Sequence, residues 1–150
     1  MSSLPNWPSA RVFMDTAPVI YHIEAHPVYG PLLAGVFGDL ELGLLRAVTS
    51  PITLAECLVH PVNSGDVRLQ RLFERIVVHG RNTEFWTIDD AIAVRAASLR
   101  SRWRIRLADA LQISVAIESG CDAFLTNDRA LARVPDLAIV IVESLRSPSP

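Results

Sequence analysis

The sequence predicts an α/β protein, a three-layer α/β/α sandwich with a parallel sheet of four to five strands. Short apolar runs typical of buried strands alternate along the chain with longer stretches of helical periodicity. Such alternation favours a parallel sheet covered by helices on both faces. With 150 residues, half of them hydrophobic, the chain is long enough for a single domain with a substantial core.

One domain is expected over residues 11–143. Residues 1–10 are polar and rich in proline and predict an extended lead-in, whereas residues 144–150 predict a disordered tail. No signal peptide pattern is present, and the longest aliphatic run, 137–142, is too short to cross a membrane. Cys57 and Cys121 both lie in apolar surroundings, so we expect buried free thiols in a cytoplasmic protein.

Each element follows from a local pattern. The expected strands are 12–15, 47–50, 84–88, 121–126 and 137–142. The expected helices are 18–26, 66–78, 90–101, 107–120 and a short one after 128. Another helix is expected to start at 28 or 31 and end at 46, and one more to start at 53 and end before a loop at 61–65. Thr53 and Glu56 match the spacing of a capping box. The helix that ends at Arg46 is apolar almost all round, which is typical of a deeply buried helix or of one covering a partner.

Four acids occupy equivalent places at strand ends or in the first helical turn near one. Asp15 follows the first strand, Glu56 comes after the second, and Asp109 and Asp128 flank the fourth. In an open parallel sheet, such positions meet at the edge where ligands bind. Taken singly, each acid is also explained as a cap or a first-turn residue. Together, clustered carboxylates repel unless a cation is present, and Mg²⁺ prefers oxygen ligands.

The basic residues are all arginine, 14 in number, and the chain has no lysine. The net charge of −2 gives no overall signature of nucleic-acid binding. An arginine-rich loop is nevertheless expected just before Asp109. Its members Arg102, Trp103, Arg104 and Arg106 suit either a solvated surface or contacts to an RNA backbone with base stacking on the indole.

Common acidic and nucleotide-binding α/β families are disfavoured by the same composition. Phospho-acceptor domains of the receiver and haloacid dehalogenase type also place an acid at the end of the first strand, but they use a lysine to neutralise the phosphoryl group. This chain has none. Neither a P-loop nor a dinucleotide-binding glycine motif occurs.

Four segments resemble the signature blocks of PIN domains, most closely those of VapC-like toxin ribonucleases. They occur in the expected order and are Val-Phe-Met-Asp-Thr at 12–16, Thr-Leu-Ala-Glu-Cys at 53–57, Arg-Leu-Ala-Asp-Ala-Leu-Gln at 106–112 and Ala-Phe-Leu-Thr-Asn-Asp at 123–128. The resemblance implies a quartet of Asp15, Glu56, Asp109 and Asp128 that binds Mg²⁺ or Mn²⁺. It places helper hydroxyl and amide groups at Thr16, Thr126 and Asn127. Ala17-Pro18 departs from the family, in which many members have a polar residue at the second position after the first Asp.

The resemblance also implies a function. It points to a metal-dependent endoribonuclease that hydrolyses RNA to 5′-phosphate and 3′-hydroxyl ends, as the toxin of a type II toxin–antitoxin (VapBC-like) pair. A homodimer and a VapB-like antitoxin are the implied partners, and Leu33, Phe37, Leu40 and Leu44 are hypothesised to contribute to such an interface. The alternative is a non-catalytic PIN-like module that binds RNA or protein, although a binding module has no need of four repelling acids.

Overall fold

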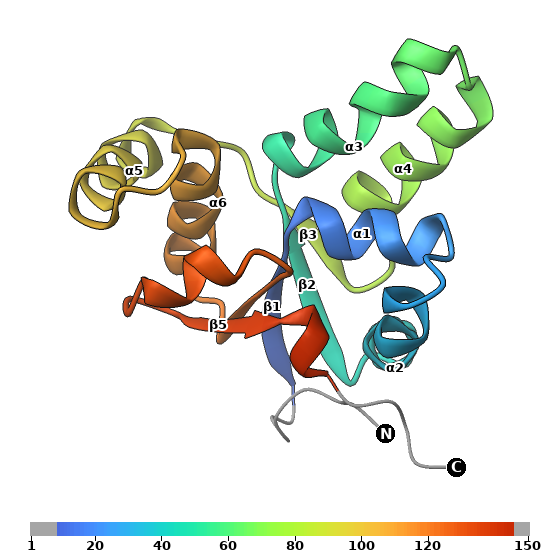
Figure 1. Cartoon of the computed structure of the whole chain (residues 1–150), viewed down its shortest axis with the longest axis horizontal. Helices are drawn as coiled ribbons and strands as arrows, with labels where there is room; N and C mark the ends of the chain where they lie inside the picture. The colour runs from blue at the N-terminus through green and yellow to red at the C-terminus, as the bar shows by residue number, and fades with distance from the viewer. Residues whose placement is uncertain (1–8, 146–150) are drawn as a thin grey trace.

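A five-stranded parallel sheet forms the centre of the molecule (Figure 1). The computed structural model describes residues 9–145, so most of the predicted lead-in and residues 146–150 of the predicted tail lie outside the described part. The strands are β1 (Ala10–Met14), β2 (Leu45–Thr49), β3 (Thr83–Phe85), β4 (Ala123–Thr126) and β5 (Ala138–Ile141). Their spatial order is β3-β2-β1-β4-β5, so the sequence order reverses direction between β1 and β4.

Helices cover both faces of the sheet, which confirms the predicted α/β/α sandwich. They are α1 (Thr16–Ile23), α2 (Tyr29–Glu41), α3 (Pro51–Ser64), α4 (Val67–His79), α5 (Asp90–Trp103) and α6 (Leu107–Glu118), with short 3₁₀ turns η1 (Arg129–Arg133) and η2 (Val142–Ser144). Helices α1 to α4 pack in one core cluster and α5 and α6 in another. The α3–α4 pair projects from the body of the molecule as an arm (Figure 1).

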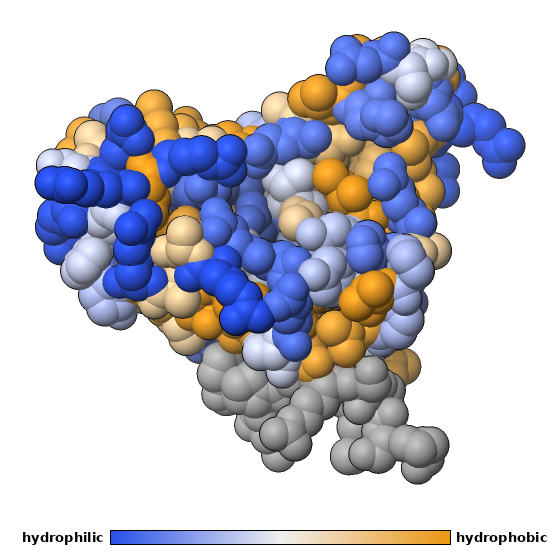
Figure 2. Space-filling model, in the orientation of Figure 1, coloured by the Kyte–Doolittle hydropathy of each residue, from blue (hydrophilic) through white to orange (hydrophobic). Residues whose placement is uncertain are grey.

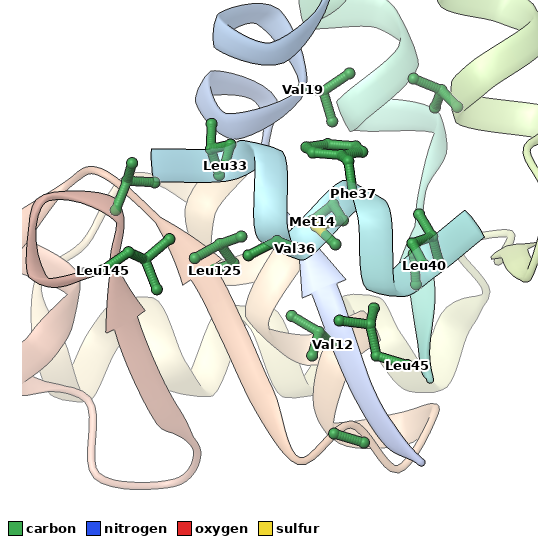
Figure 3. Close-up of a cluster of buried hydrophobic side chains, with 14 of the residues drawn as sticks. Val12, Met14, Val19, Leu33, Val36, Phe37, Leu40, Leu45, Leu125 and Leu145 are labelled. Atoms are coloured by element: carbon green, nitrogen blue, oxygen red, sulfur yellow. The ribbon is translucent and has the colours of Figure 1, made fainter. Parts of the chain in front are cut away.

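Alternating side chains of β1 divide the core into these two clusters. Val12 and Met14 point to the α1–α4 side, where they meet Leu33 and Val36 of α2 (Figure 3). Phe13, between them in sequence, points to the other face and stacks on Phe124 of β4, with ring centroids 5.0 Å apart. This two-residue period buries both faces of the central strand, and it positions the end of the strand between two packed layers.

The apolar helix is shorter and more deeply buried than the sequence suggested. Helix α2 ends at Glu41 rather than at Arg46, because Gly43 takes a left-handed conformation (φ +73°) and Leu45 begins β2. Leu33, Phe37 and Leu40 are at most 8% exposed and belong to the core. Of the four residues hypothesised to contribute to a partner interface, only Leu44 is exposed, and that contribution stays a prediction.

Boundaries of α3 and α5 also differ from the predictions. Ser50, not Thr53, caps α3, and its hydroxyl accepts a hydrogen bond from the Ile52 amide. The predicted capping box is wrong, because Thr53 is fully buried and its hydroxyl donates to the carbonyl of Met14. Helix α3 also continues through Pro61 into the segment predicted to be a loop. The segment up to Trp103 completes α5 instead of forming a loop.

Both cysteines are free and buried, as predicted. Within residues 9–145, no helix combines the length and apolar character needed to cross a bilayer.

Candidate active site

The candidate site lies at the carboxyl ends of β1 and β4, where the strand order reverses. This is the position at which open α/β sheets bind ligands. The two strands are paired in parallel, with Met14 opposite Leu125, and the amide of Asp15 donates to the carbonyl of Leu125 at 3.0 Å. The pairing brings the residues that follow each strand to one place, although they are more than a hundred positions apart in the sequence.

Asp15 is the innermost acid and is only 9% exposed. As the N-cap of α1, its Oδ1 accepts a hydrogen bond from the Thr16 amide at 2.9 Å. Its Oδ2 accepts one from the Thr126 hydroxyl at 2.8 Å. The carboxylate of Asp15 therefore caps α1, and the same residue lines the cleft described below.

Glu56 reaches the same site from α3. It lies in the second turn of that helix rather than the first, since the helix begins at Pro51. Its Oε1 accepts a hydrogen bond from the Thr16 hydroxyl at 2.8 Å. Thr16 thus donates hydrogen bonds from its amide to Asp15 and from its hydroxyl to Glu56, and it links the two acids.

Asp109 enters from α6 and is 7% exposed. It lies in the first helical turn, where the helix dipole favours an acid. Its carboxylate is paired with the guanidinium of Arg106, with Nε 3.0 Å from Oδ2 and Nη2 3.4 Å from Oδ1. Arg106 is therefore an ion-pair partner of an acid in the site, a contact that the sequence did not predict.

Asp128 lies at the exposed rim of the site, after β4. Its Oδ1 caps η1 by accepting from the Ala130 amide at 2.9 Å, and its own amide donates to the Thr126 hydroxyl at 3.1 Å. Asn127 donates to the Tyr21 hydroxyl at 3.4 Å, and its Oδ1 is buried without a hydrogen-bond partner among the described residues.

All four acids line one open cleft with a volume of about 460 Å³. In the space-filling view, hydrophilic residues surround a hollow between the α3–α4 arm and the α5–α6 layer (Figure 2). The predicted Thr16, Thr126, Asn127 and Arg106 line the same cleft. Ala17, Ile20 and Tyr21 also line it, and the sequence did not predict them as site residues. The only feature of the sequence that could have indicated them is their position in the first two turns of the helix that follows Asp15.

The cleft is electrostatically unfavourable for its own carboxylates. The pKa of Asp15 is raised from its usual 3.8 to about 6, mainly by burial and in smaller part by the negative charges of Asp109 and Glu56. The hydrogen bonds from Thr126 and the Thr16 amide oppose this rise only partly. A cation in the cleft would reverse the effect.

The remaining residues of the predicted RNA-binding segment lie away from the cleft lining. Arg102 is 3.5 Å from Asp136, and Trp103 packs against the second core cluster with its indole N–H buried and unpaired. Arg104 ends α5 in a left-handed conformation. Of the four residues predicted to contact RNA, only Arg106 lines the cleft.

The oxygen-rich lining suits a hard divalent cation. In residues 9–145, no three His, Cys, Asp or Glu side chains are drawn together into a ready-made metal centre. This spacing is expected, because carboxylates repel one another when no cation lies between them. The donors nevertheless fit the ion, because three acids, the rim acid Asp128 and the amide residue Asn127 line one cleft.

A buried polar network holds the elements that carry these acids. The amide of Gln112 on α6 donates to the Thr53 hydroxyl at 2.8 Å, and its carbonyl oxygen accepts from the Ser50 hydroxyl. Since Thr53 also donates to the carbonyl of Met14, the network joins α6, α3 and the end of β1. Gln112 ends the PIN-like segment 106–112, but nothing in the sequence indicated this role.

Comparison with known proteins identifies the family. The family profile of the PIN domain matches residues 12–137. No curated protein sequence matches the chain. The chain resembles VapBC2 of Rickettsia felis, solved on a DNA fragment from their promoter, with 21% identity, a TM-score of 0.67, and coverage of 87% of this chain and 98% of the other.

Two other solved structures have the same fold. One is a toxin–antitoxin complex from Klebsiella pneumoniae, with 18% identity, a TM-score of 0.63, and coverage of 87% and 97%. The other is VapC20 of Mycobacterium tuberculosis, described as a Sarcin-Ricin loop cleaving toxin, with 14% identity, a TM-score of 0.62, and coverage of 75% and 86%. The profile match spans most of the chain and includes all four acids, and the chain belongs to the PIN domain family.

Proposed function

We propose that this PIN domain is a divalent-metal-dependent endoribonuclease and the toxin of a type II toxin–antitoxin pair. One observation carries the proposal. Asp15, Glu56 and Asp109 come from three different elements and line one cleft with Asp128, even though burial and the charges of Asp109 and Glu56 disfavour the charged form of Asp15. Such an arrangement costs stability, and a cation-dependent reaction gives a reason for retaining it.

Each residue has a defined part in the proposed site. Asp15 and Asp109 are the first choice for direct ligands of Mg²⁺ or Mn²⁺, and Glu56 and Asp128 complete or orient the set. When bound, the cation neutralises charge on the phosphoryl oxygens and makes water a better nucleophile. Thr126 and Thr16 hold the carboxylates of Asp15 and Glu56 by hydrogen bonds of 2.8 Å.

RNA is the proposed substrate. The cleft is open to solvent and its volume of about 460 Å³ admits a nucleotide and its phosphate. The description of VapC20 as a Sarcin-Ricin loop cleaving toxin supports an RNA substrate for a chain of the same fold.

An antitoxin is the proposed partner, because the similar structures include VapBC and toxin–antitoxin complexes. A second, more apolar groove of about 270 Å³ lies away from the acids, between α1, α2 and the end of α4. Phe37 and Leu40 form part of its floor, and His22 stacks on Phe37 with ring centroids 3.8 Å apart. This groove is suited to an apolar side chain of an antitoxin. The chain is also proposed to form a homodimer, through another face.

RNA cleavage is the test of the nuclease proposal. The wild-type chain is incubated with single-stranded RNA and Mg²⁺ or Mn²⁺, beside Asp15→Asn, Asp109→Asn and a control, Asp90→Asn, in an exposed acid of α5. We expect both site variants to lose about 100-fold or more of the activity and the control to keep it. Products should carry 5′-phosphate ends.

Two results would reject the proposal. Equal cleavage by the wild type and both site variants would exclude the acidic site. Absence of cleavage with every divalent metal, together with measurable RNA binding, would favour the non-catalytic binding module. For the partner, size-exclusion chromatography that shows a strict monomer, with no gain in size on adding the product of a neighbouring small gene, would count against the toxin–antitoxin assignment.

A further inference from the structure

Arg106 is the only basic residue among positions 9–145 that forms a salt bridge with any of the four acids. Its contact with Asp109 uses two nitrogens and both carboxylate oxygens, at 3.0 and 3.4 Å. The fork of a guanidinium matches a carboxylate in this way. The two oxygens that a cation would need on Asp109 are therefore already engaged.

The two partners differ in their freedom to move. The side chain of Asp109 is 9% exposed, whereas that of Arg106 is 73% exposed. Arg106 precedes α6 with an extended backbone, and its side chain makes no other hydrogen bond among the described residues. It can swing into solvent without disturbing the core, while Asp109 stays in place.

The surrounding charges also favour a cation at this point. The pKa of Arg106 is raised mainly by Asp109, and Glu56 and Asp128 add to the effect. The guanidinium therefore lies in the field of three acids of the cleft and offsets part of the repulsion among them.

We propose that Arg106 is a built-in competitor of the divalent cation, which neutralises Asp109 in the metal-free protein and leaves it when the metal binds. This inference rests on the proposed function and adds a residue that sets the metal affinity of the site. The released guanidinium remains beside the cleft, where it can contact a phosphate of RNA.

Metal affinity without any substrate gives the first test. Binding of Mn²⁺ is followed by the loss of the free-ion signal in electron paramagnetic resonance, for the wild type, Arg106→Gln and Arg106→Lys. The matched control is Arg95→Gln, which removes an arginine from the partly exposed pair with Glu118 outside the cleft. We expect Arg106→Gln to bind Mn²⁺ about three- to ten-fold more tightly, Arg106→Lys to lie between, and Arg95→Gln to match the wild type.

The second test follows the guanidinium itself. The Nε–H resonance of Arg106, assigned by its absence in Arg106→Lys, is recorded by ¹⁵N-correlated NMR during a titration with Mg²⁺. We expect it to move from a hydrogen-bonded to a free position as the ion saturates the site. A resonance that does not move while Mg²⁺ binds would overturn the proposal.

The outcomes separate this inference from the function on which it rests. Wild type and Arg106→Gln with equal Mn²⁺ affinity, lost in Asp15→Asn, would reject the competitor and keep the metal site. No Mn²⁺ binding in any variant would reject both. Circular dichroism confirms that each variant is folded.

Discussion

At the residue scale, Asp15 combines two roles that compete for its charge. Its carboxylate caps α1 and also borders the cleft beside Asp109 and Glu56. The cap and the Thr126 hydroxyl stabilise the ionised form, but burial, together with the charges of Asp109 and Glu56, outweighs them, and the pKa is raised to about 6. The acid that the proposed function needs most is therefore a source of instability in the metal-free chain.

Asp15→Asn is expected to stabilise the metal-free protein at pH 7. Because folding raises the pKa of Asp15 from 3.8 to about 6, the contribution of this group to stability is full below pH 3.8 and is lost as the pH rises through about 6. An amide avoids the loss, so urea unfolding at pH 7 should show a gain of at most about 3 kcal/mol. The gain should shrink at pH 4.5, and a variant that is less stable at both values would contradict the prediction.

Thr126→Val tests the hydroxyl that holds Asp15. The Thr126 side chain is buried, donates to Asp15 and accepts from the amide of Asp128, so valine leaves both groups without that partner. We expect a loss of about 1–3 kcal/mol in unfolding free energy and roughly ten-fold in RNA cleavage. Thr126→Ser keeps the hydroxyl and should retain most of both. Equal behaviour of the two variants would assign Thr126 a packing role only.

At the element scale, α3 and α6 are the supports of the cleft, since they carry Glu56 and Asp109. Their relative position depends on buried hydrogen bonds from Gln112 to Thr53 and Ser50. Such bonds have defined directions and distances, whereas apolar contacts alone permit sliding. The network therefore fixes the spacing of two acids that belong to different layers.

Gln112→Leu is expected to weaken this support. Leucine nearly preserves the volume but leaves the hydroxyls of Ser50 and Thr53 without their partner in a dry environment. The unfolding free energy should fall by roughly 2–3 kcal/mol in urea denaturation. Gln70→Leu is the control, because the side-chain amide of Gln70 on α4 makes a single part-buried bond to the carbonyl of Pro61 on α3 and its loss should cost less than about 1 kcal/mol. A similar cost for both would argue against the network.

At the scale of the whole molecule, a cation should be linked to global stability. An ion that binds the folded chain and not the unfolded one stabilises it by about 2.7 kcal/mol at a hundred times its dissociation constant. We expect the Tm in differential scanning calorimetry to rise with Mn²⁺ in the wild type. Neither Asp15→Asn nor Asp109→Asn should show the full rise, because each lacks a proposed ligand. An equal rise in all three would place the ion elsewhere.

Local patterns in the sequence predicted much of the fold. Short apolar runs located all five strands, since a strand buried on both faces needs apolar side chains throughout. The acids were found because each follows a strand or begins a helix. The end of α2 was misplaced, because an apolar pattern continues past Gly43 into β2 and periodicity does not reveal where a helix gives way to a strand.

Polar contacts between side chains could not be predicted from local patterns in this way. Arg106 and Asp109 are only three positions apart, but an arginine at this place suits a solvated surface equally well, so the sequence did not predict their ion pair. The meeting of Gln112 with Thr53, and of Tyr21 with Asn127, depends on how separate elements pack. No spacing along the chain encodes such contacts.

By itself, the sequence determined the fold class, the family resemblance and the four acids, because strand hydrophobicity and motif order are properties of short segments. Only the tertiary structure decided that α2 is buried, that Thr53 joins a core network instead of capping a helix, and that Arg106 pairs with Asp109. The physical reason is that burial and polar pairing are settled by packing between elements, where each polar group must find a partner once water is excluded.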